Sequence, residues 1–230
     1  LRLFPSYRKF SPLTNFVFLA TILLTSYIAV WFFEAHPLVA AGIIALPGIL
    51  FLLYAQSAKL LAVTLLAALA GTAHEVFFIQ EGYWWYREAS FLGIPAYLPV
   101  IWANIGILSV AIYKGILIID RKKYLLYILP PFPKALGLTV SAILASLFGI
   151  FFLAPHPFWL MAFFLIIDIL YVYWMRSIPL ALVGILALGA GSTADLIAVP
   201  LGIWQYPMST ASFLGVPLYI FIGWDVVGIL

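Results

Sequence analysis

A succession of long apolar segments, separated by short polar connections, limits the folds open to this chain. A bilayer core is about 30 Å thick, so a helix that crosses it needs about 20 mainly apolar residues. Segments near that length predict eight membrane-spanning helices, at residues 13–33, 38–55, 59–80, 94–119, 136–153, 158–175, 179–200 and 214–230. The expected fold class is therefore all-α, a polytopic membrane helix bundle.

The composition agrees with this fold class. Hydrophobic residues make up 66% of the chain and charged residues only 8%, whereas soluble domains are about one-quarter charged. The basic residues occur in short clusters and not along one face, so nucleic acid is not an expected partner. The chain has no cysteine and three histidines, so we expect neither a metal site nor a cofactor.

The basic residues also predict the orientation. Arg87 stands alone in one set of alternate connections, and most other basic residues fall in the opposite set. Basic residues favour cytoplasmic loops, so the pattern predicts a multi-pass protein of the cell membrane with both termini cytoplasmic. The predicted inside residues are Arg2, Arg8, Lys9, Lys59, Arg121, Lys122, Lys123, Lys134 and Arg176.

An internal repeat predicts the architecture. The segment 89–97 returns as 211–219 with seven of nine residues identical. At a spacing of 120 residues, Glu75 matches Asp195 and Gly71 matches Gly191, and at a spacing of 122 Trp102 matches Trp224.

Each copy holds an even number of predicted spans, so the copies share one orientation. The sequence therefore predicts two parallel four-helix repeats, at residues 1–120 and 121–230. The second copy is shorter than the first, and we expect it to be truncated at its carboxyl end.

Acidic residues inside the predicted spans are the candidate catalytic groups, because a bilayer disfavours them. Glu75 and Asp195 occupy matched positions in the outer third of the membrane, and a carboxyl group in hydrocarbon tends to keep its proton. Both are predicted proton donors. Asp168 and Asp225 fall nearer the midplane and match apolar residues in the first copy. The alternative is that each acid only ties neighbouring helices together.

Aromatic residues follow both acid-bearing helices. Ring faces stabilise cations in a dry site, although an interfacial aromatic belt has the same appearance in sequence. The predicted substrate-binding residues are His74, Trp84, Trp85, Tyr86, Trp102, Trp204, Tyr206, Trp224 and Asp225.

Two motifs resemble known families. Gly71, Glu75, Gly82 and Tyr86, followed by the segment 92–102, resemble the core pattern of membrane-embedded carotenoid hydratases. The segments 202–207 and 214–217 are similar to the related membrane lycopene cyclases, whose fused form also has two repeats. Those cyclases carry two acidic residues just after the proline, where this chain has Tyr97-Leu98 and Tyr219-Ile220. Hydratase-like chemistry is therefore the closer analogy.

The resemblance implies a membrane enzyme that binds a lipophilic isoprenoid or carotenoid beside the membrane lipid, and homo-oligomers are possible. Glu75 or Asp195 is expected to protonate a terminal double bond, and the tryptophans to stabilise the carbocation. Hydration or cyclisation would follow without a redox cofactor. The alternatives are a small-solute or proton-coupled transporter, since parallel repeats with buried acids also occur in carriers, and a non-catalytic membrane scaffold.

Overall fold

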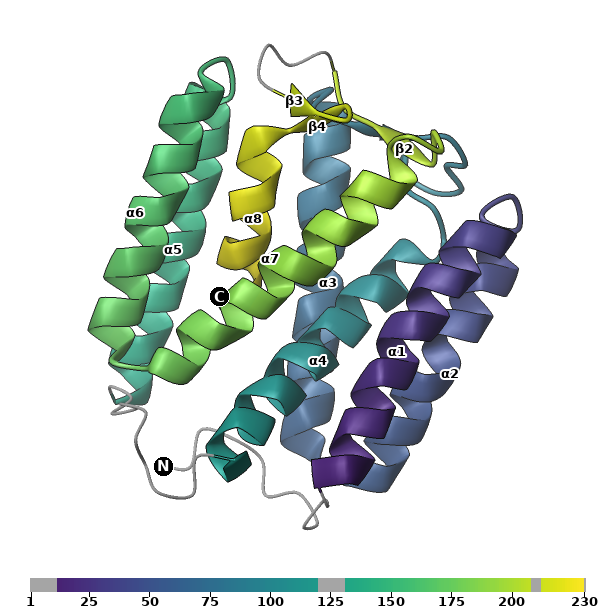
Figure 1. The fold of residues 1–230 in the computed structure, drawn as a ribbon, viewed down its shortest axis with the longest axis vertical. Helices are drawn as coiled ribbons and strands as arrows, with labels where there is room; N and C mark the ends of the chain where they lie inside the picture. Colours follow the sequence, from purple (N-terminus) through teal and green to yellow (C-terminus); the bar gives the residue numbers. More distant parts are fainter. Residues whose placement is uncertain (1–11, 120–130, 208–211, 230) are drawn as a thin grey trace. The chain divides into compact units, whose positions relative to one another are not determined.

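The computed structural model describes residues 12–119, 131–207 and 212–229, and this part of the chain consists of eight helices and four two-residue strands joined by turns and short connections (Figure 1). The helices are α1 (Pro12–Phe33), α2 (Pro37–Ala55), α3 (Ala58–Gln80), α4 (Leu98–Ile119), α5 (Phe132–Leu153), α6 (Pro157–Met175), α7 (Ile178–Ala198) and α8 (Leu218–Ile229). The strands are β1 (Trp85–Tyr86), β2 (Trp204–Gln205), β3 (Ser212–Phe213) and β4 (Val216–Pro217). The all-α class is confirmed.

Local sequence signals set the bounds of several helices. Pro37 and Pro157 stand at the first position of α2 and α6, where a proline's fixed φ suits a helix and its missing N–H costs nothing. The same two helices end at Gln56 and Arg176, whose φ angles of 46° and 49° leave the helical region. These matched residues give α2 and α6 the same length, 19 residues.

Seven of the described helices, α1 to α7, are long and apolar enough to cross a membrane. The eighth predicted span, 214–230, needs correction, because α8 has only 12 residues. Residues 212–217 form the hairpin of β3 and β4 instead of helix. The fourth predicted span also began too early, since α4 starts at Leu98. The basic residues expected at 2–9 and 121–123 lie outside the described residues.

Two matched tight turns explain why the predicted spans 94–119 and 214–230 both begin before the helices α4 and α8. Leu92-Gly93 and Leu214-Gly215 form two-residue turns in which every φ is positive, from 51° to 83°. Such turns match the twist of a hairpin, and glycine adopts positive φ without steric cost. A Cβ at Gly93 would also lie 2.9 Å from Cγ2 of Ile79, so the turn folds back onto the end of α3.

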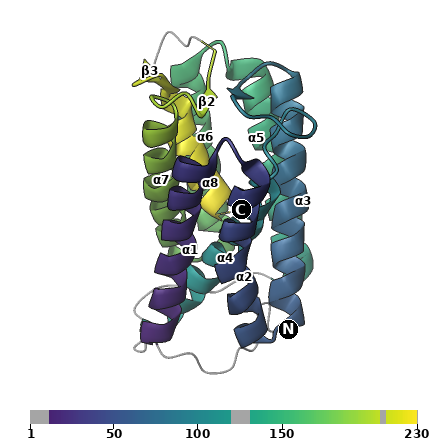
Figure 2. The same cartoon turned by 90° about the vertical axis from the view of Figure 1, so that its right-hand side faces the viewer.

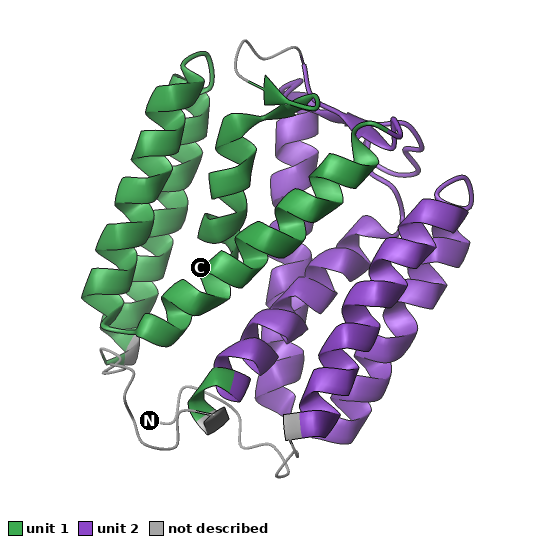
Figure 3. Cartoon of the chain, in the orientation of Figure 1, with its two compact units in different colours: residues 1, 116–200, 208–230 green, residues 2–115, 201–207 purple. Residues whose placement is uncertain are grey.

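The chain forms two compact units (Figure 3). Unit 2 comprises residues 2–115 together with 201–207, and unit 1 comprises residues 116–200 with 208–230. The segment 201–207 comes from the second half of the chain but belongs to unit 2. Strand β2 accounts for this, because it pairs antiparallel with β1, with Tyr86 opposite Trp204.

Each unit has an apolar core of its own. In unit 2, α1 and α2 lie side by side (Figures 1 and 2) around Ile22 and Phe51, which are fully buried. In unit 1, α5 and α8 both pack against α6, around Leu160, Phe164 and Val226. Lipid is as apolar as these side chains, so close packing and interhelical hydrogen bonds hold such helices together.

Candidate functional site

The site in unit 2 is centred on Glu75 of α3, whose side chain is 7% exposed. The Trp84 Nε1–H donates a hydrogen bond to Glu75 Oε2 over 2.8 Å, and the Tyr86 hydroxyl donates to the same oxygen over 3.0 Å. Both donors come from the segment that directly follows α3. A carboxylate formed at Glu75 therefore meets two donors that are already in place.

Aromatic rings gather beside this acid. The His74 ring lies 4.6 Å from the ring of Phe78, 5.8 Å from Trp84 and 6.1 Å from Trp102, measured between centroids. Phe78 stacks on Trp84 at 5.2 Å. The Nδ1 atom of His74 is buried and has no hydrogen-bond partner among the described residues. The predicted residues His74, Trp84 and Trp102 therefore lie together in an apolar, ring-lined environment next to Glu75.

A glycine lets Trp102 reach this cluster. A Cβ at Gly71 would lie 2.0 Å from Cδ2 of Trp102, so only glycine at that position of α3 admits the indole ring of α4. Gly71 thus permits a close contact between α3 and α4. The contact belongs to the class of small-residue interfaces typical of membrane helices.

The segment 201–207 adds two further rings in unit 2. Tyr206 contacts the ring of Trp84 at 6.1 Å, and Trp204 contacts the ring of Tyr86 at 5.8 Å. Sequence analysis associated Trp204 and Tyr206 with the Asp195 helix that precedes them. The structure brings them to the two residues that hydrogen-bond Glu75, and no local sequence pattern signals a pairing across more than 100 residues.

Trp85 differs from its neighbours on the same segment. It is 46% exposed whereas Trp84 is 8% exposed, as expected for successive residues of an extended strand that point to opposite sides. The structure thus separates two adjacent predicted site residues.

An ion pair that the sequence did not predict lies in unit 2. Glu34 follows the end of α1 and is only 6% exposed, and it accepts hydrogen bonds from Nε and Nη2 of Arg87, the former over 3.0 Å. The hydrogen bond to Glu34 raises the pKa of the Arg87 guanidinium. The backbone N–H of Arg87 donates to the Ile203 carbonyl over 3.0 Å. Arg87 therefore links the end of α1 to the segment that carries Trp204 and Tyr206.

Tyr97, just before α4, is a second feature that the sequence did not single out. It is 1% exposed, and its hydroxyl has no hydrogen-bond partner among the described residues. Burial raises the pKa of the phenol, and the negative charge of Glu34 raises it further. Tyr97 therefore remains neutral.

The acid of unit 1 is Asp195 on α7, which is 1% exposed. The Trp224 Nε1–H of α8 donates to Asp195 Oδ2 over 2.5 Å. A Cβ at Gly191 would lie 2.0 Å from Cδ2 of Trp224, the same value as for Gly71 and its tryptophan. The glycine–tryptophan contact is thus the same in the two units, but the donors to the acids differ, because Trp84 and Tyr86 donate to Glu75 whereas Trp224, the match of Trp102, donates to Asp195.

The remaining predicted site residue, Asp225, lies on α8 in unit 1 beside Asp168 of α6. The two carboxyl groups are within hydrogen-bonding range of one another. Asp168 is 5% exposed, and neither of its oxygens receives a donor from the described residues.

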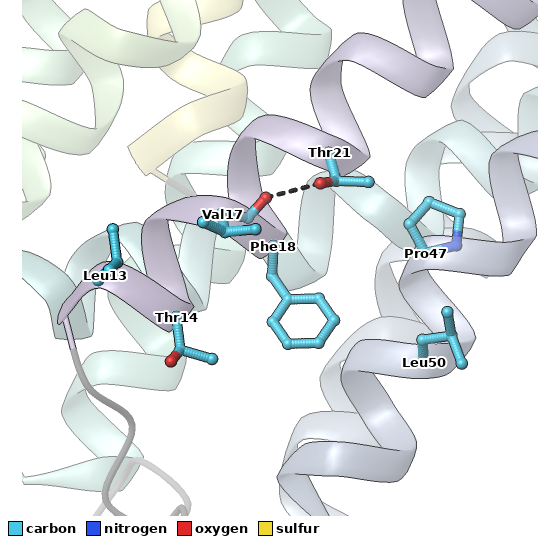
Figure 4. A pocket seen from close by; sticks show the side chains of 7 residues that line it. All are labelled: Leu13, Thr14, Val17, Phe18, Thr21, Pro47 and Leu50. Carbon is cyan, nitrogen blue, oxygen red and sulfur yellow. Dashed lines mark hydrogen bonds between the residues drawn. The ribbon is translucent and has the colours of Figure 1, made fainter.

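A cavity of about 340 Å³ opens between α1 and α2 (Figure 4). It is lined by Leu13, Thr14, Val17, Phe18, Thr21, Pro47 and Leu50. The Thr21 hydroxyl donates to the Val17 carbonyl of its own helix over 2.8 Å, so its hydrogen-bonding capacity is partly used within α1. None of the predicted site residues lines this cavity.

Comparison with known proteins gives a likeness of fold. No family model matches the chain, and no curated protein matches it. Among solved structures, the crystal structure of a cross-linked MvINS trimer is similar, with a TM-score of 0.59 and 16% sequence identity over 74% of this chain and 89% of that chain. At this identity the likeness concerns the fold alone.

Proposed function

We propose that the chain is an integral membrane enzyme of isoprenoid or carotenoid metabolism that starts hydration or cyclisation by protonating a polyene end. The observation that supports it is the surroundings of Glu75: a buried carboxyl group with two hydrogen-bond donors and a cluster of aromatic rings. The resemblance to carotenoid hydratases supplies the substrate class.

In the proposed mechanism, protonated Glu75 gives its proton to a terminal double bond. Trp84 and Tyr86 both donate to Oε2, so Oε1 is the oxygen that carries the transferable proton. Transfer leaves a carboxylate, and the two fixed donors stabilise it without reorganisation. Burial alone would make that carboxylate costly, so the donors are what allow the acid to release its proton.

The carbocation that forms needs electron-rich, non-nucleophilic surroundings. The faces of Trp84, Trp102 and Phe78 offer this, because aromatic quadrupoles attract cations most strongly where water is excluded. In hydration, water adds to the cation and returns one proton to the Glu75 carboxylate, which leaves the alcohol. In cyclisation, an internal double bond attacks instead, and the new cation loses a proton to the carboxylate to give the cyclic alkene. Asp195 with Trp224 is proposed as the corresponding acid of unit 1.

The proposed architecture is two parallel four-helix repeats with both termini cytoplasmic. Support comes from the matched turns, helix ends and glycine–tryptophan contacts of the two units. Reporter fusions at Arg121 and Arg87 are expected to be cytoplasmic and exterior, respectively. Both reporters on one side would contradict this arrangement.

A proton-coupled transporter is the second candidate. The buried carboxyl group of Asp168 and the half-buried one of Asp225 support it, since intramembrane acids often lie on proton pathways. A transporter would carry a proton-dependent flux across vesicles, whereas the enzyme would change the pigment of the cell.

The first test is conversion of an acyclic carotenoid in cells that express the chain beside a lycopene pathway. Glu75→Gln keeps the size and hydrogen bonding of the side chain but removes the transferable proton, and we expect conversion to fall by at least about 100-fold. Trp84→Phe removes one donor to the carboxylate and is expected to lower conversion by about 100-fold.

Trp85→Phe is the matched control, because Trp85 is adjacent in sequence but exposed. We expect it to retain conversion. Each variant is compared by its yield of monodisperse protein in detergent. Full conversion by well-folded Glu75→Gln would refute the proposed role of Glu75.

A further inference from the structure

The contact between α6 and α8 in unit 1 contains two acids that the proposed reaction does not use. Asp168 lies in the middle of α6 and Asp225 lies on α8, and these helices pack against each other. Asp168 is 5% exposed, and both of its oxygens, with Oδ1 of Asp225, lack a donor among the described residues.

Such a pair cannot stay in hydrocarbon as two carboxylates. Two ionised carboxylates only accept hydrogen bonds, so they repel each other and neither satisfies the other. When one of them holds a proton, its O–H donates to the other, so a single hydrogen ion removes one of the two negative charges, ends the repulsion and joins the two side chains by a hydrogen bond. The side chains of Asp168 and Asp225 are within the range that this bond requires.

In unit 2, the matched contact between α2 and α4 contains no acidic residue. Gly48 matches Asp168, and a Cβ at Gly48 would lie 2.3 Å from Oδ1 of Asn104. The Asn104 amide donates to the Ile44 carbonyl over 3.0 Å, so this part of the contact between α2 and α4 is neutral and hydrogen-bonded. The contact in unit 1 therefore carries acids that packing alone does not require.

We propose that Asp168 and Asp225 form a proton-binding site in which the two carboxyl groups share one hydrogen ion. The site is independent of Glu75 and of the proposed reaction. A divalent cation is a poorer fit, because the described residues contain no group of three or more histidine, aspartate or glutamate side chains placed to hold one.

None of the other described titratable groups on helices α5 to α8 donates a hydrogen bond to Asp168. Asp195 on α7 accepts from Trp224, and the Tyr171 hydroxyl on α6 bonds to Thr139 of α5. Lys134 on α5 is exposed. The other titratable groups of these four helices and their ends are His156, Tyr173, Arg176 and Tyr219.

The test is modification of the purified full chain by dicyclohexylcarbodiimide, which reacts with protonated carboxyl groups in apolar surroundings, followed by mass-spectrometric mapping. We expect adducts at Asp168 or Asp225 that decrease about tenfold for each pH unit above the titration midpoint, as for a single proton. Sodium ions at constant pH are expected to have no effect. Protection by sodium would overturn the proposal in favour of a cation site.

The variant Asp168→Asn decides whether the proton is shared. Its amide can donate to Asp225, which then has no need of a proton, so we expect adducts at Asp225 to fall at least tenfold. Unchanged modification of Asp225 would show that the two acids titrate independently and would overturn the proposal. Asp195→Asn is the control for a change of a buried acid elsewhere in unit 1, and it should leave the adducts unchanged.

A second readout does not depend on access of the reagent. If the folded protein holds a proton that the unfolded chain releases, its thermal stability falls as the pH rises. Asp168→Asn removes this dependence, and matched melting curves at several pH values measure it. The absence of adducts, together with parallel pH profiles of wild type and variant, would overturn the proposal.

Discussion

Units 1 and 2 use matched backbone positions with different side chains at the contact between their second and fourth helices. In unit 2, Gly48 makes room for Asn104, whose amide is hydrogen-bonded. In unit 1, the matched contact between α6 and α8 holds Asp168, whose oxygens receive no donor from the described residues, beside Asp225. The turns, helix ends and glycine–tryptophan contacts of the two units are nevertheless the same. The comparison shows that backbone geometry was kept while polar chemistry diverged.

The largest expected effect is a loss of stability at the glycine–tryptophan contact that the two units share. Gly71→Ala and Gly191→Ala each place a Cβ 2.0 Å from an indole carbon, and overpacking of this kind costs about 1–3 kcal/mol or more. Both variants should lose thermal stability in detergent to a similar degree.

Gly189→Ala is the matched control, because a Cβ there meets nothing within 4 Å and alanine favours a helix. It should be neutral or stabilising. If Gly71→Ala lost thermal stability and Gly191→Ala did not, the glycine–tryptophan contacts of the two units would not be equivalent.

An intermediate effect is expected where the units differ. Gly48→Ala forces the Asn104 side chain away from its place and weakens its hydrogen bond to Ile44, at a cost of about 1–2 kcal/mol. Asp168→Ala at the matched position removes the repulsion between the two acids and the proton uptake that folding requires of them near neutral pH, so it is expected to be neutral or stabilising. Melting temperatures measured near neutral pH should fall for Gly48→Ala and stay level or rise for Asp168→Ala. Equal losses for the two variants would contradict the proposed difference between the units.

The smallest expected effect concerns the contact between the first two helices of each unit. In unit 1 the hydroxyls of Thr139 and Tyr171 are 2.8 Å apart, and the matched residues of unit 2 are Leu19 and Phe51. Tyr171→Phe removes one hydrogen bond and should cost about 1 kcal/mol.

The reciprocal change, Phe51→Tyr, puts a hydroxyl at a position that is fully buried among apolar residues. We expect it to cost about 1 kcal/mol, the lower end of the penalty for a buried polar group without a partner, because the hydroxyl loses its water without gaining a hydrogen bond. Chemical unfolding of the two variants beside the wild type measures both. A stabilising Phe51→Tyr would mean that unit 2 offers a partner after all.

Part of the site followed from the sequence. The match of Glu75 with Asp195 identified the two buried acids that accept hydrogen bonds from tryptophan. The match of Gly71 with Gly191 likewise identified two glycines that lie at equivalent close contacts with a tryptophan. Such features are visible because depth along a helix and repeat spacing are read directly from residue numbers.

Other parts of the site required the structure. The buried Glu34, which pairs with Arg87, gave no signal, because one acid next to a helix end resembles a loop residue. Trp84 and Trp85 are alike in sequence, and only the local strand geometry separates the buried ring from the exposed one.

The sequence by itself determined the long helices, because a 20-residue apolar segment must satisfy its own backbone hydrogen bonds in a bilayer whatever its neighbours are. The tertiary structure alone decided that β2 pairs with β1, which brings Trp204 and Tyr206 to the Glu75 cluster, and that Asp168 faces Asp225. These contacts join residues that are 57 to 122 positions apart. Hydrophobic patterns act within a few turns of chain, so they cannot encode which distant side chains meet.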